Sequence, residues 1–465
     1  MAIPRIMISA VRGGEGKTIL TTGLVSALDQ KYHKRVLPFK KGPDYIDAGW
    51  LALAAGRPCS NLDTYLISPS KILSLFSEAT PEGDIAIIEG NRGLYDGIDL
   101  QGDTSSAELS KLLKTPVILS LDASKISRTL AAVVLGCIHF DPDVQIEGVV
   151  LNRVANSRHE AVLRKNIEHY CKVPVLGAIP KLQILVPERY MGLVSPAELQ
   201  LPIETIQKLG EIVATYVDVD HILQIATRAL PLEKKSKERT EIVSKINQPV
   251  KIGILKDSVF QFYYPENLTA LEKEGATLIF TSPQNETVLP DMDALYIGGG
   301  FPETQAQLLS KNNSYRESIR LHAEKGLPIY AESGGFMYLG KELLLGNQQY
   351  PMCDVLPFTF TFLKKPQGHG YTHYEVVRKN PYLPIGTKAK AHEFHYSSVC
   401  DFNGDTTSFV FQMKRGKGIY NGWDGFCYKN VLATHSHIHA AGFSEWAPAF
   451  VQKAREYHSL MRVEK

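Results

Sequence analysis

The chain has 465 residues, with 51 lysines and arginines against 49 aspartates and glutamates. Apolar residues make up 44% and charged residues 22%, proportions that are typical of a folded globular protein and exclude a disordered or fibrous chain. At roughly 150 residues per domain, the length predicts two or three domains. The near-neutral charge favours neither nucleic acid nor an anionic membrane as a partner.

Cysteine usage and hydropathy indicate where such a chain works. Six cysteines occur and no two of them form a C-x-x-C pair, which is typical of a reducing compartment and not of a disulfide framework. No apolar run reaches the ~20 residues that a membrane-spanning helix needs. Residues 1–10 are too short and too soon interrupted for a signal peptide. We therefore expect a cytoplasmic protein with no membrane partner.

The first half of the chain alternates short apolar runs with longer segments of helical spacing. The runs are rich in β-branched residues and cover residues 3–9, 36–40, 85–89, 117–122, 148–152 and 173–179. Helical spacing is found at residues 17–28, 107–113 and 158–170. Buried strands that alternate with helices predict βαβ units and a mainly parallel sheet covered on both faces.

A glycine-rich segment, RGGEGKT, follows the first predicted strand and leads into a predicted helix. Its glycines let backbone N–H groups surround phosphate oxygens, and the helix N-terminus adds its positive dipole end. Lys17 is expected to reach the outer phosphates and the Thr18 hydroxyl to bind Mg²⁺. The strict motif has glycine six residues before the lysine, where this chain has Val11. The nucleotide-binding residues that we predict here, for ATP or GTP, are Gly14, Glu15, Gly16, Lys17 and Thr18.

Polar residues end or follow the next predicted strands. Glu89 ends an apolar strand, the position from which a carboxylate holds Mg²⁺ directly or through water. Asp44 and Asp47 follow the second strand in FKKGPDYID, and Asp96 lies in a glycine-flanked loop. Because open α/β folds bind ligands at the carboxyl edge of the sheet, we expect Asp44 and Asp47 near the glycine-rich segment. Turn or helix-cap roles explain the two aspartates equally well, and Asn152 is either a base-reading residue or a cap.

The composition changes between residues 228 and 250, where the chain is charged and poorly periodic and then reaches Gln-Pro. We interpret residues 229–249 as a linker with a boundary near 245, between a first domain at 1–228 and a second at 250–465. The second half restarts an α/β pattern, with predicted strands at 251–255, 276–281, 294–298 and 327–330 and a predicted helix at 336–344. Residues from about 350 to 440 are richer in aromatic residues, glycine and threonine, which predicts a mixed, partly antiparallel sheet.

Two glycine-rich segments dominate the second half. In GGGFPE, which follows a predicted strand, the backbone N–H groups of Gly299 and Gly300 are candidates for an oxyanion hole. In YAESGG, which follows another strand and precedes the predicted helix, Ser333 stands at the turn. A strand, a sharp turn and a helix form the setting of a nucleophile elbow, although the stricter motif has glycine in place of Ala331.

A nucleophilic serine needs a base, and histidines are plentiful in this half. Residues 434–439 (THSHIH) lie at a predicted strand end and supply His437, while His392 and His395 are rivals. Histidine clusters also bind metal ions, but these histidines alternate as they would along a strand, which disfavours a metal site. For any single histidine, burial in a core with its hydrogen bonds satisfied is the ordinary alternative.

Together these motifs resemble the cobyrinic acid a,c-diamide synthase family over nearly the whole chain. The matching stretches are FKKGPDYID (39–47), NLD (61–63), IEGNRGLYDG (88–97), GVVLNR (148–153), PERYMGLV (187–194), FYYPENL (262–268), GGGFPE (298–303), AESGGFMYL (331–339) and HEFHYS (392–397). The resemblance implies an N-terminal ATP-dependent amidoligase domain, similar to dethiobiotin synthetase, and a C-terminal class I glutamine-amidotransferase-like α/β domain.

The reaction that this resemblance implies has two stages. ATP phosphorylates an acetate side chain of a modified tetrapyrrole, and ammonia from glutamine then displaces the phosphate to leave an amide. Members of the family act on cobyrinate, nickel-sirohydrochlorin or sirohaem, and the forms GRPC-x-NLD and IEGN-x-GLYDG favour the sirohaem-amidating branch. The resemblance also implies a homodimer.

Roles for individual residues follow from the same resemblance. The Mg²⁺ side of the site is implied to consist of Thr18, Asp44 and Glu89. The positions that bind or orient the acetate and its acyl phosphate are occupied by Tyr45, Ile46, Asp47 and Asp96. Asn152 matches an adenine-reading asparagine of related enzymes, and His437 matches the catalytic histidine.

Ser333 departs from the family, which has a nucleophilic cysteine at this position. A histidine activates a thiol far more readily than a hydroxyl. Three interpretations stay open: an engineered replacement that traps glutamine, a natural serine in an enzyme that uses free ammonia, and a working serine–histidine glutaminase.

The segment around Arg12 is a second departure, since it resembles the loop of partition-type ATPases with Arg12 in place of their signature lysine. One alternative function is therefore a nucleotide-switched ATPase without small-molecule chemistry. Another is a ligase of the same fold that acts on a small carboxylate.

Overall fold

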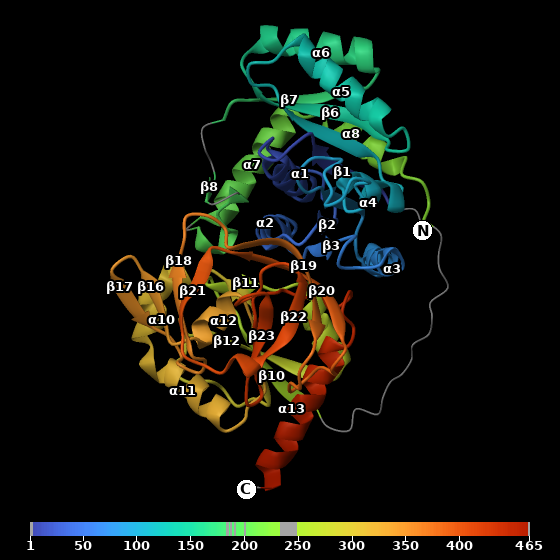
Figure 1. The fold of residues 1–465 in the computed structure, drawn as a ribbon. Coiled ribbons are helices and arrows are strands. Elements are labelled where there is room, and N and C mark those ends of the chain that lie inside the picture. The colour runs from blue at the N-terminus through green and yellow to red at the C-terminus, as the bar shows by residue number, and fades with distance from the viewer. Residues whose placement is uncertain are drawn as a thin grey trace. The chain divides into compact units, whose positions relative to one another are not determined.

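The computed structural model of the protein describes residues 3–182, 186, 188–189, 192–199, 201–232 and 249–463. The chain divides into two compact units, residues 1–239 and 240–465, and each has an α/β fold (Figure 1). Most of the predicted linker at 229–249 and part of the stretch at 187–194 lie outside the described residues. The domain boundary near residue 245 therefore stays a prediction.

The first unit contains a seven-stranded parallel sheet in the order β3-β2-β4-β1-β5-β6-β7. Its strands are β1 (Arg5–Ala10), β2 (Val36–Lys41), β3 (Ser60–Leu62), β4 (Ile85–Glu89), β5 (Val117–Asp122), β6 (Ile146–Val154) and β7 (Val175–Pro180). All six predicted strands of the first half are present. Strand β3 was missed because three residues carry too little periodicity.

Helices cover both faces of this sheet, as predicted. They are α1 (Lys17–Gln30), α2 (Tyr45–Ala55), α3 (Pro69–Ala79), α4 (Ser106–Leu112), α5 (Arg128–Phe140), α6 (Ser157–Cys171), α7 (Pro202–Tyr216) and α8 (Val219–Thr227). One core joins α1, α2, α7 and α8 to the sheet through Ile8, Leu24, Trp50, Val213 and Ile225. The connections from β1 to β2 and β3 run toward one edge of the sheet, and those from β4 to β5, β6 and β7 run toward the other edge. Because such crossovers are right-handed, α4, α5 and α6 lie on the face opposite α1 and α2. A short hairpin, β8 (Glu188–Arg189) and β9 (Gly192–Leu193), precedes α7.

The second unit contains a nine-stranded sheet in the order β12-β10-β13-β15-β24-β23-β22-β19-β20. It is parallel from β12 to β24 and antiparallel from β24 to β20. The strands are β10 (Val250–Leu255), β12 (Ala276–Thr281), β13 (Ala294–Ile297), β15 (Ile329–Glu332), β19 (Gly368–Val376), β20 (Lys388–His395), β22 (Phe409–Arg415), β23 (Trp423–Tyr428) and β24 (Val431–Thr434). The predicted mixed sheet is thus confirmed.

Smaller sheets and helices complete this unit. Strands β16 (Glu342–Leu345), β17 (Gln348–Pro351), β18 (Phe358–Phe362) and β21 (Ser397–Phe402) form one small sheet, and β11 (Phe260–Phe262) pairs with β14 (Gly299–Gly300). The helices are α9 (Pro265–Lys273), α10 (Ala306–Lys311), α11 (Asn313–Glu324), α12 (Gly334–Leu339) and α13 (Trp446–Val463). The helix predicted at 336–344 is wrong at its C-terminal end, because residues from Glu342 pair with β17 and β18 as a strand.

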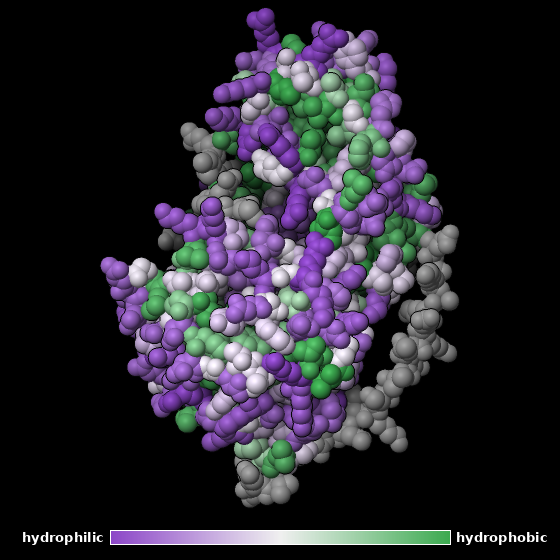
Figure 2. Space-filling view, viewed as in Figure 1, coloured by the Kyte–Doolittle hydropathy of each residue, from purple (hydrophilic) through white to green (hydrophobic). Residues whose placement is uncertain are grey.

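The surface agrees with the even balance of charges. Figure 2 shows one face on which hydrophilic residues predominate and apolar residues are interspersed among them. Leu100 and Phe140 are among the large apolar side chains that are exposed. Within the residues that the structure describes, we find no helix with both the length and the apolar character needed to cross a membrane.

Candidate functional site

The glycine-rich segment between β1 and α1 has the backbone of a phosphate-binding loop. Gly14 and Gly16 have φ angles of 77° and 80°, which only glycine adopts without strain, and α1 begins directly at Lys17. The Lys17 ammonium is folded back over the loop and donates to the carbonyls of Arg12 at 3.2 Å and Arg92 at 2.7 Å. Burial and the neighbouring Lys40 ammonium lower the pKa of Lys17. Phosphate oxygens can replace these carbonyl acceptors.

We expect Gly16→Ala to lose nucleotide affinity and Gly13→Ala to keep it. A Cβ on Gly16 would lie 2.7 Å from Asn152 Nδ2 on a left-handed backbone, whereas a Cβ on Gly13 meets no described heavy atom within 4 Å beyond its chain neighbours. The left-handed conformation alone costs alanine about 1–2 kcal/mol. If nucleotide binding requires this conformation, the same free energy is lost from binding and the affinity falls roughly tenfold. Titration with a fluorescent ATP analogue measures both variants, and equal affinities would contradict a nucleotide site at this loop.

Acidic side chains from neighbouring strands meet around one buried lysine. Strands β2 and β4 are adjacent, with Lys40 directly opposite Glu89. The Lys40 ammonium, 1% exposed, donates to Asp47 Oδ2 and to Glu89 Oε1, each at 2.7 Å, and Asp44 Oδ2 lies 4.0 Å away. Burial opposes the ammonium form, but Asp47, Glu89 and Asp44 together raise the pKa of Lys40. Sequence analysis expected Asp44 and Asp47 at this edge but assigned no role to Lys40.

Three carboxyl groups, of Asp44, Asp47 and Glu89, surround the one Lys40 ammonium. Burial and the nearby Asp47 raise the pKa of Asp44, and burial raises the pKa of Glu89. Burial also opposes ionisation of Asp47, but the Lys40 ammonium lowers the pKa of Asp47 below its ordinary value. Asp44 Oδ1 accepts the N–H groups of Ile46 and Asp47 at 3.0 Å, so Asp44 also caps α2. A further cation beside Asp44 and Glu89 would therefore favour their ionised forms, and Asp44 has its predicted helix-cap role as well.

The donor set next to Lys17 fits Mg²⁺. The Thr18 hydroxyl donates to Glu89 Oε1 at 3.0 Å, while Glu89 Oε2 is buried and has no hydrogen-bond partner among the described residues. Within that part of the chain, no group of three or more His, Cys, Asp and Glu residues is arranged to hold a metal alone. Mg²⁺ in proteins commonly takes one or two carboxylates and completes its octahedron with phosphate oxygens and water. Thr18 and Glu89 are thus suitable ligands, and a role for Asp44 stays a prediction.

Asn152 lies beneath the glycine-rich segment. Its Nδ2 donates to the Glu15 carbonyl and to the Ser120 hydroxyl, both at 2.9 Å. The Glu15 carboxylate turns back and accepts the Val11 N–H at 3.1 Å. Both side chains therefore support the loop in this structure, and reading of the adenine base by Asn152 stays a prediction.

The residues predicted to hold the acetate lie along the same edge. Asp96 Oδ2 accepts the N–H of Gly93 at 2.8 Å. Gly93 itself touches the glycine-rich segment, since a Cβ on it would come 2.3 Å from the Val11 carbonyl oxygen. Tyr45 and Ile46 begin α2 and are half-buried, and Ile46 packs against the core. The structure thus places Asp96 beside the loop and Tyr45 and Ile46 beside Asp44.

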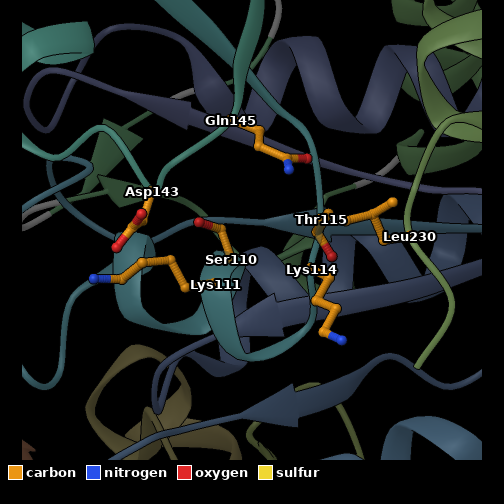
Figure 3. A pocket seen from close by; sticks show the side chains of 7 residues that line it. All are labelled: Ser110, Lys111, Lys114, Thr115, Asp143, Gln145 and Leu230. Atoms are coloured by element: carbon orange, nitrogen blue, oxygen red, sulfur yellow. The ribbon is translucent and has the colours of Figure 1, made fainter. Parts of the chain in front are cut away.

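A surface pocket of about 240 Å³ lies elsewhere in the first unit (Figure 3). It is lined by Ser110, Lys111, Lys114, Thr115, Asp143, Gln145 and Leu230. Thr115 and Gln145 precede β5 and β6, so the pocket lies at the amino ends of these strands, the edge opposite Lys17 and Glu89. Ligands of open α/β sheets bind at the carboxyl edge, and the Lys111 ammonium is already paired with Asp141 at 2.7 Å. We assign this pocket no role.

Ser333 occupies the turn between β15 and α12 in the second unit. Its φ of 46° and ψ of −101° are strained for a residue with a side chain. Its N–H donates to the Thr434 carbonyl at 2.7 Å, which holds the turn against the end of β24. The predicted strand, sharp turn and helix are therefore present, and the side chain is presented in the manner of a nucleophile elbow.

The predicted oxyanion-hole glycines lie next to this turn. A Cβ on Gly334 would come 2.8 Å from Gly300 N, and one on Gly299 would come 2.5 Å from His437 Cε1. The N–H of Gly298 is used by the Tyr263 hydroxyl, which accepts it at 2.7 Å. Only glycine allows these approaches, so the structure brings Gly299 and Gly300 together with the turn and His437. Binding of an oxyanion by these two residues stays a prediction.

The three histidines of residues 434–439 have different partners. The sequence predicted that these histidines alternate along a strand. This prediction is wrong, because β24 ends at Thr434, before the first of them. His435 stacks on His395 with ring centroids 3.8 Å apart, whereas His437 lies against Gly299 and faces Glu332 at 3.5 Å. The geometry therefore favours His437 over His395 as the base.

Buried Asp424 organises this segment, although sequence analysis did not single it out. Its Oδ1 accepts the His435 N–H at 3.0 Å, and its Oδ2 accepts the hydroxyls of Thr434 and Ser436, both at 2.8 Å. Burial raises the pKa of Asp424, and these donors oppose that effect. A carboxylate on the neighbouring strand β23 thus holds the turn from which the histidines project.

We expect the second unit to lose stability on acidification because His395 is buried in the neutral form. Burial lowers the pKa of His395 to about 4, below the ordinary 6.5. The unfolded chain therefore binds a proton that the folded chain does not between pH 6.5 and 4, so this stability is present above pH 6.5 and lost below it. Each such histidine contributes a slope of about 1.4 kcal/mol per pH unit.

Urea unfolding between pH 7.5 and 5 checks this expectation. His395→Gln should flatten the pH dependence relative to the natural chain, and replacement of the exposed His369 by glutamine should not. The same slope in all three proteins would show that His395 is not neutral in the folded state.

Two known domain families match the chain, one in each unit. Residues 6–192 match the CobQ/CobB/MinD/ParA nucleotide binding domain, and residues 251–444 match the CobB/CobQ-like glutamine amidotransferase domain. The first match contains the glycine-rich loop and the three acids, and the second contains Ser333 and His437. The nucleotide-binding and amidotransferase folds expected from sequence are confirmed.

Curated relatives match the chain along its length. The cobyrinate a,c-diamide synthase of Magnetococcus marinus is 42% identical over 464 residues, 98% of each chain. The cobyrinate a,c-diamide synthase of Archaeoglobus fulgidus is 40% identical over 455 residues, again 98% of each. A more distant solved structure, the MinD cell division protein of Aquifex aeolicus, is 17% identical with a TM-score of 0.30 and covers 50% of this chain and 99% of its own. The chain belongs to the cobyrinate a,c-diamide synthase family.

Proposed function

We propose that this protein converts acetate side chains of a modified tetrapyrrole, such as cobyrinate or sirohaem, into acetamides at the expense of ATP. One observation carries the proposal: Lys17, Thr18, Asp44, Asp47 and Glu89 meet at one edge of a nucleotide-binding fold. Relatives named for the reaction on cobyrinate support it, while the choice between cobyrinate and sirohaem stays open. The proposal includes Mg²⁺ and a homodimer.

The first stage joins the acetate to phosphate. A carboxylate oxygen of the acetate attacks the γ-phosphorus of ATP, the bond to the β-phosphate breaks, and ADP leaves. Lys17 moves from the carbonyls of Arg12 and Arg92 to the transferred phosphate and offsets its charge. Thr18 and Glu89 would hold Mg²⁺, which would offset phosphate charge. Asp47 and Asp96 orient the acetate that is phosphorylated.

The second stage forms the amide. The nitrogen of ammonia attacks the acyl carbon, the bond to the phosphate oxygen breaks, and inorganic phosphate leaves with loss of one proton from nitrogen. Ammonia comes from glutamine, released at residue 333 with His437 as base, or from solution. The unactivated hydroxyl of Ser333 is a poor nucleophile, which makes free ammonia the more effective donor for this chain.

Product analysis tests this function. The purified protein with ATP and Mg²⁺ is offered cobyrinate, sirohaem or nickel-sirohydrochlorin, each with ammonium or glutamine, and products are identified by mass spectrometry. We expect one or two acetate-to-acetamide conversions on one of the three, with one ADP released per amide. No amide on any tetrapyrrole would contradict the proposal.

A nucleotide-switched ATPase is the second candidate, favoured by the match of residues 6–192 to a domain family that also includes MinD and ParA. The two functions predict different ATP turnover. Amidation makes turnover depend on a tetrapyrrole acetate and ammonia together. Turnover that is indifferent to both would favour the switch.

A further inference from the structure

The buried carboxylate of Glu332 lies one residue before Ser333 and faces His437. Its Oε2 is 3.5 Å from His437 Nδ1, and the two side chains are 0% and 3% exposed. Glu332 ends β15, and no role was predicted for it from the sequence. A carboxylate beside the ring of a candidate base is the arrangement that orients the base in catalytic triads.

The groups that face this carboxylate can all donate hydrogen bonds. Oε1 accepts the Tyr330 hydroxyl and the Ile438 N–H, both at 3.2 Å, and Oε2 accepts the Tyr296 hydroxyl at 3.1 Å. A carboxylate accepts about four hydrogen bonds. Oε2 therefore has room for one further donor, and His437 Nδ1–H lies on that side.

The other edge of the His437 ring faces Gly299 in the segment GGGFPE (298–303). A Cβ on Gly299 would come 2.5 Å from Cε1 and 3.4 Å from Nε2 of His437. Two backbone hydrogen bonds with His392, at 3.1 and 2.7 Å, fix the His437 main chain, and the His392 ring stacks on it at 4.9 Å. With Nδ1 toward Glu332, Nε2 lies on the side where Gly299 and Gly300 adjoin the turn at Ser333.

His439, two residues after His437, is engaged elsewhere. Its Nδ1 accepts the Ala441 N–H at 3.2 Å, and its Nε2 faces Glu266 Oε2 at 3.5 Å. The pair of His439 and Glu266 thus has the same 3.5 Å separation as the pair of His437 and Glu332. Because Glu332 directly precedes Ser333 and Glu266 lies in α9, the pair of His439 and Glu266 is a matched control.

We propose that Glu332 is a positioning residue for the glutaminase half of the proposed function, on which this inference rests. Glu332 Oε2 accepts His437 Nδ1–H and fixes that tautomer. Nε2 is left without a proton and takes the one released by the nucleophile at position 333. The 3.5 Å separation shortens to a hydrogen bond when substrate fills the site, as is common for catalytic contacts in unliganded enzymes.

A kinetic comparison in the Ser333→Cys background tests this role. Adding Glu332→Gln keeps the size of the side chain but replaces an acceptor oxygen by a donor, and we expect kcat for glutamine hydrolysis to fall by ~100-fold or more with little change in KM. Adding Glu266→Gln should cost less than about threefold. Equal losses in the two double variants, or none in the first, would overturn the inference.

Two measurements distinguish a positioning role of Glu332 from a merely structural one. Ammonium-dependent amidation depends on the first unit and should be unchanged, and near-UV circular dichroism should report native packing around Tyr296 and Tyr330. If Glu332→Gln does not fold, Tyr330→Phe removes a single donor to the same carboxylate and leaves the His437 contact in place. Glutaminase activity within about threefold of the Ser333→Cys parent is expected for Tyr330→Phe.

Nitrogen NMR of the chain with Ser333 tests the tautomer of His437 and needs no activity measurement. In ¹⁵N-histidine-labelled protein, with the His437 signals assigned by their loss in His437→Gln, we expect the proton on Nδ1. In Glu332→Gln that preference should disappear, and in Glu266→Gln it should persist. A proton on Nε2 in the natural chain would overturn the inference. If Ser333→Cys gains no glutaminase activity, the glutamine part of the proposed function fails, while this measurement still decides the role of Glu332.

Discussion

Replacement of Lys17 by alanine is expected to abolish amidation with either nitrogen donor. The Lys17 ammonium lies against the phosphate loop, where it donates to the carbonyls of Arg12 and Arg92, and the acyl phosphate of the proposed reaction concentrates negative charge at that place. Removing a preorganised charge of this kind costs ~10³-fold or more in rate. The measurement is amide formation with saturating ATP and ammonium, followed by mass spectrometry.

Glu89→Ala is expected to have the same outcome for a different reason. It removes the buried oxygen that is available to Mg²⁺ and one of the two carboxylates that hold Lys40 at 2.7 Å. Loss of a buried charge partner also destabilises the fold by several kcal/mol, so thermal unfolding must accompany the assay.

Lys31→Ala is the matched control for Lys17→Ala, because Lys31 is exposed and caps the far end of the same helix. It should keep full activity. Amidation that persists in Lys17→Ala, or in a folded Glu89→Ala, would remove the nucleotide site from this edge of the sheet.

Replacement of Ser333 by cysteine is expected to confer glutamine-dependent amidation. The strained backbone, the adjoining glycines and His437 are already arranged around residue 333, so the thiol meets a formed site. A thiol with an ordinary pKa near 8.5 is ionised by a histidine far more readily than a serine hydroxyl. We expect the rate with glutamine to rise by ~100-fold or more and the rate with ammonium to stay unchanged.

Two outcomes for the chain with Ser333 bear on the interpretations of this residue. Activity with ammonium alone indicates an ammonia-using enzyme or an engineered block, and activity with glutamine indicates a working serine–histidine glutaminase. Ser333→Ala distinguishes the last case, because it should abolish glutamine use and spare ammonium use. If Ser333→Cys gains nothing with glutamine, residue 333 is not the nucleophile position.

The sequence pattern predicted most of the strands and helices, because each βαβ unit has a recognisable pattern among residues that are neighbours in the chain. The apolar runs at β1, β2 and β4 and the glycine-rich loop before Lys17 are readable from neighbours in the chain. The elbow at Ser333 is likewise a local signal of strand, small residues and helix. Helix ends were less predictable, and α12 stops at Leu339 because the residues from Glu342 form strand β16, which pairs with β17 and β18.

The sequence by itself determined which chemical groups are present and that the two α/β halves each carry a loop rich in glycine. Only the tertiary structure decided which of those groups act together. Strand register puts Lys40 opposite Glu89. The fold of the second unit puts Glu332 beside His437. These pairs join residues 49 and 105 positions apart, and no local propensity reports such contacts. They form because a buried charged group is stable only beside groups that offset its charge or donate hydrogen bonds to it, a condition that the whole fold must satisfy.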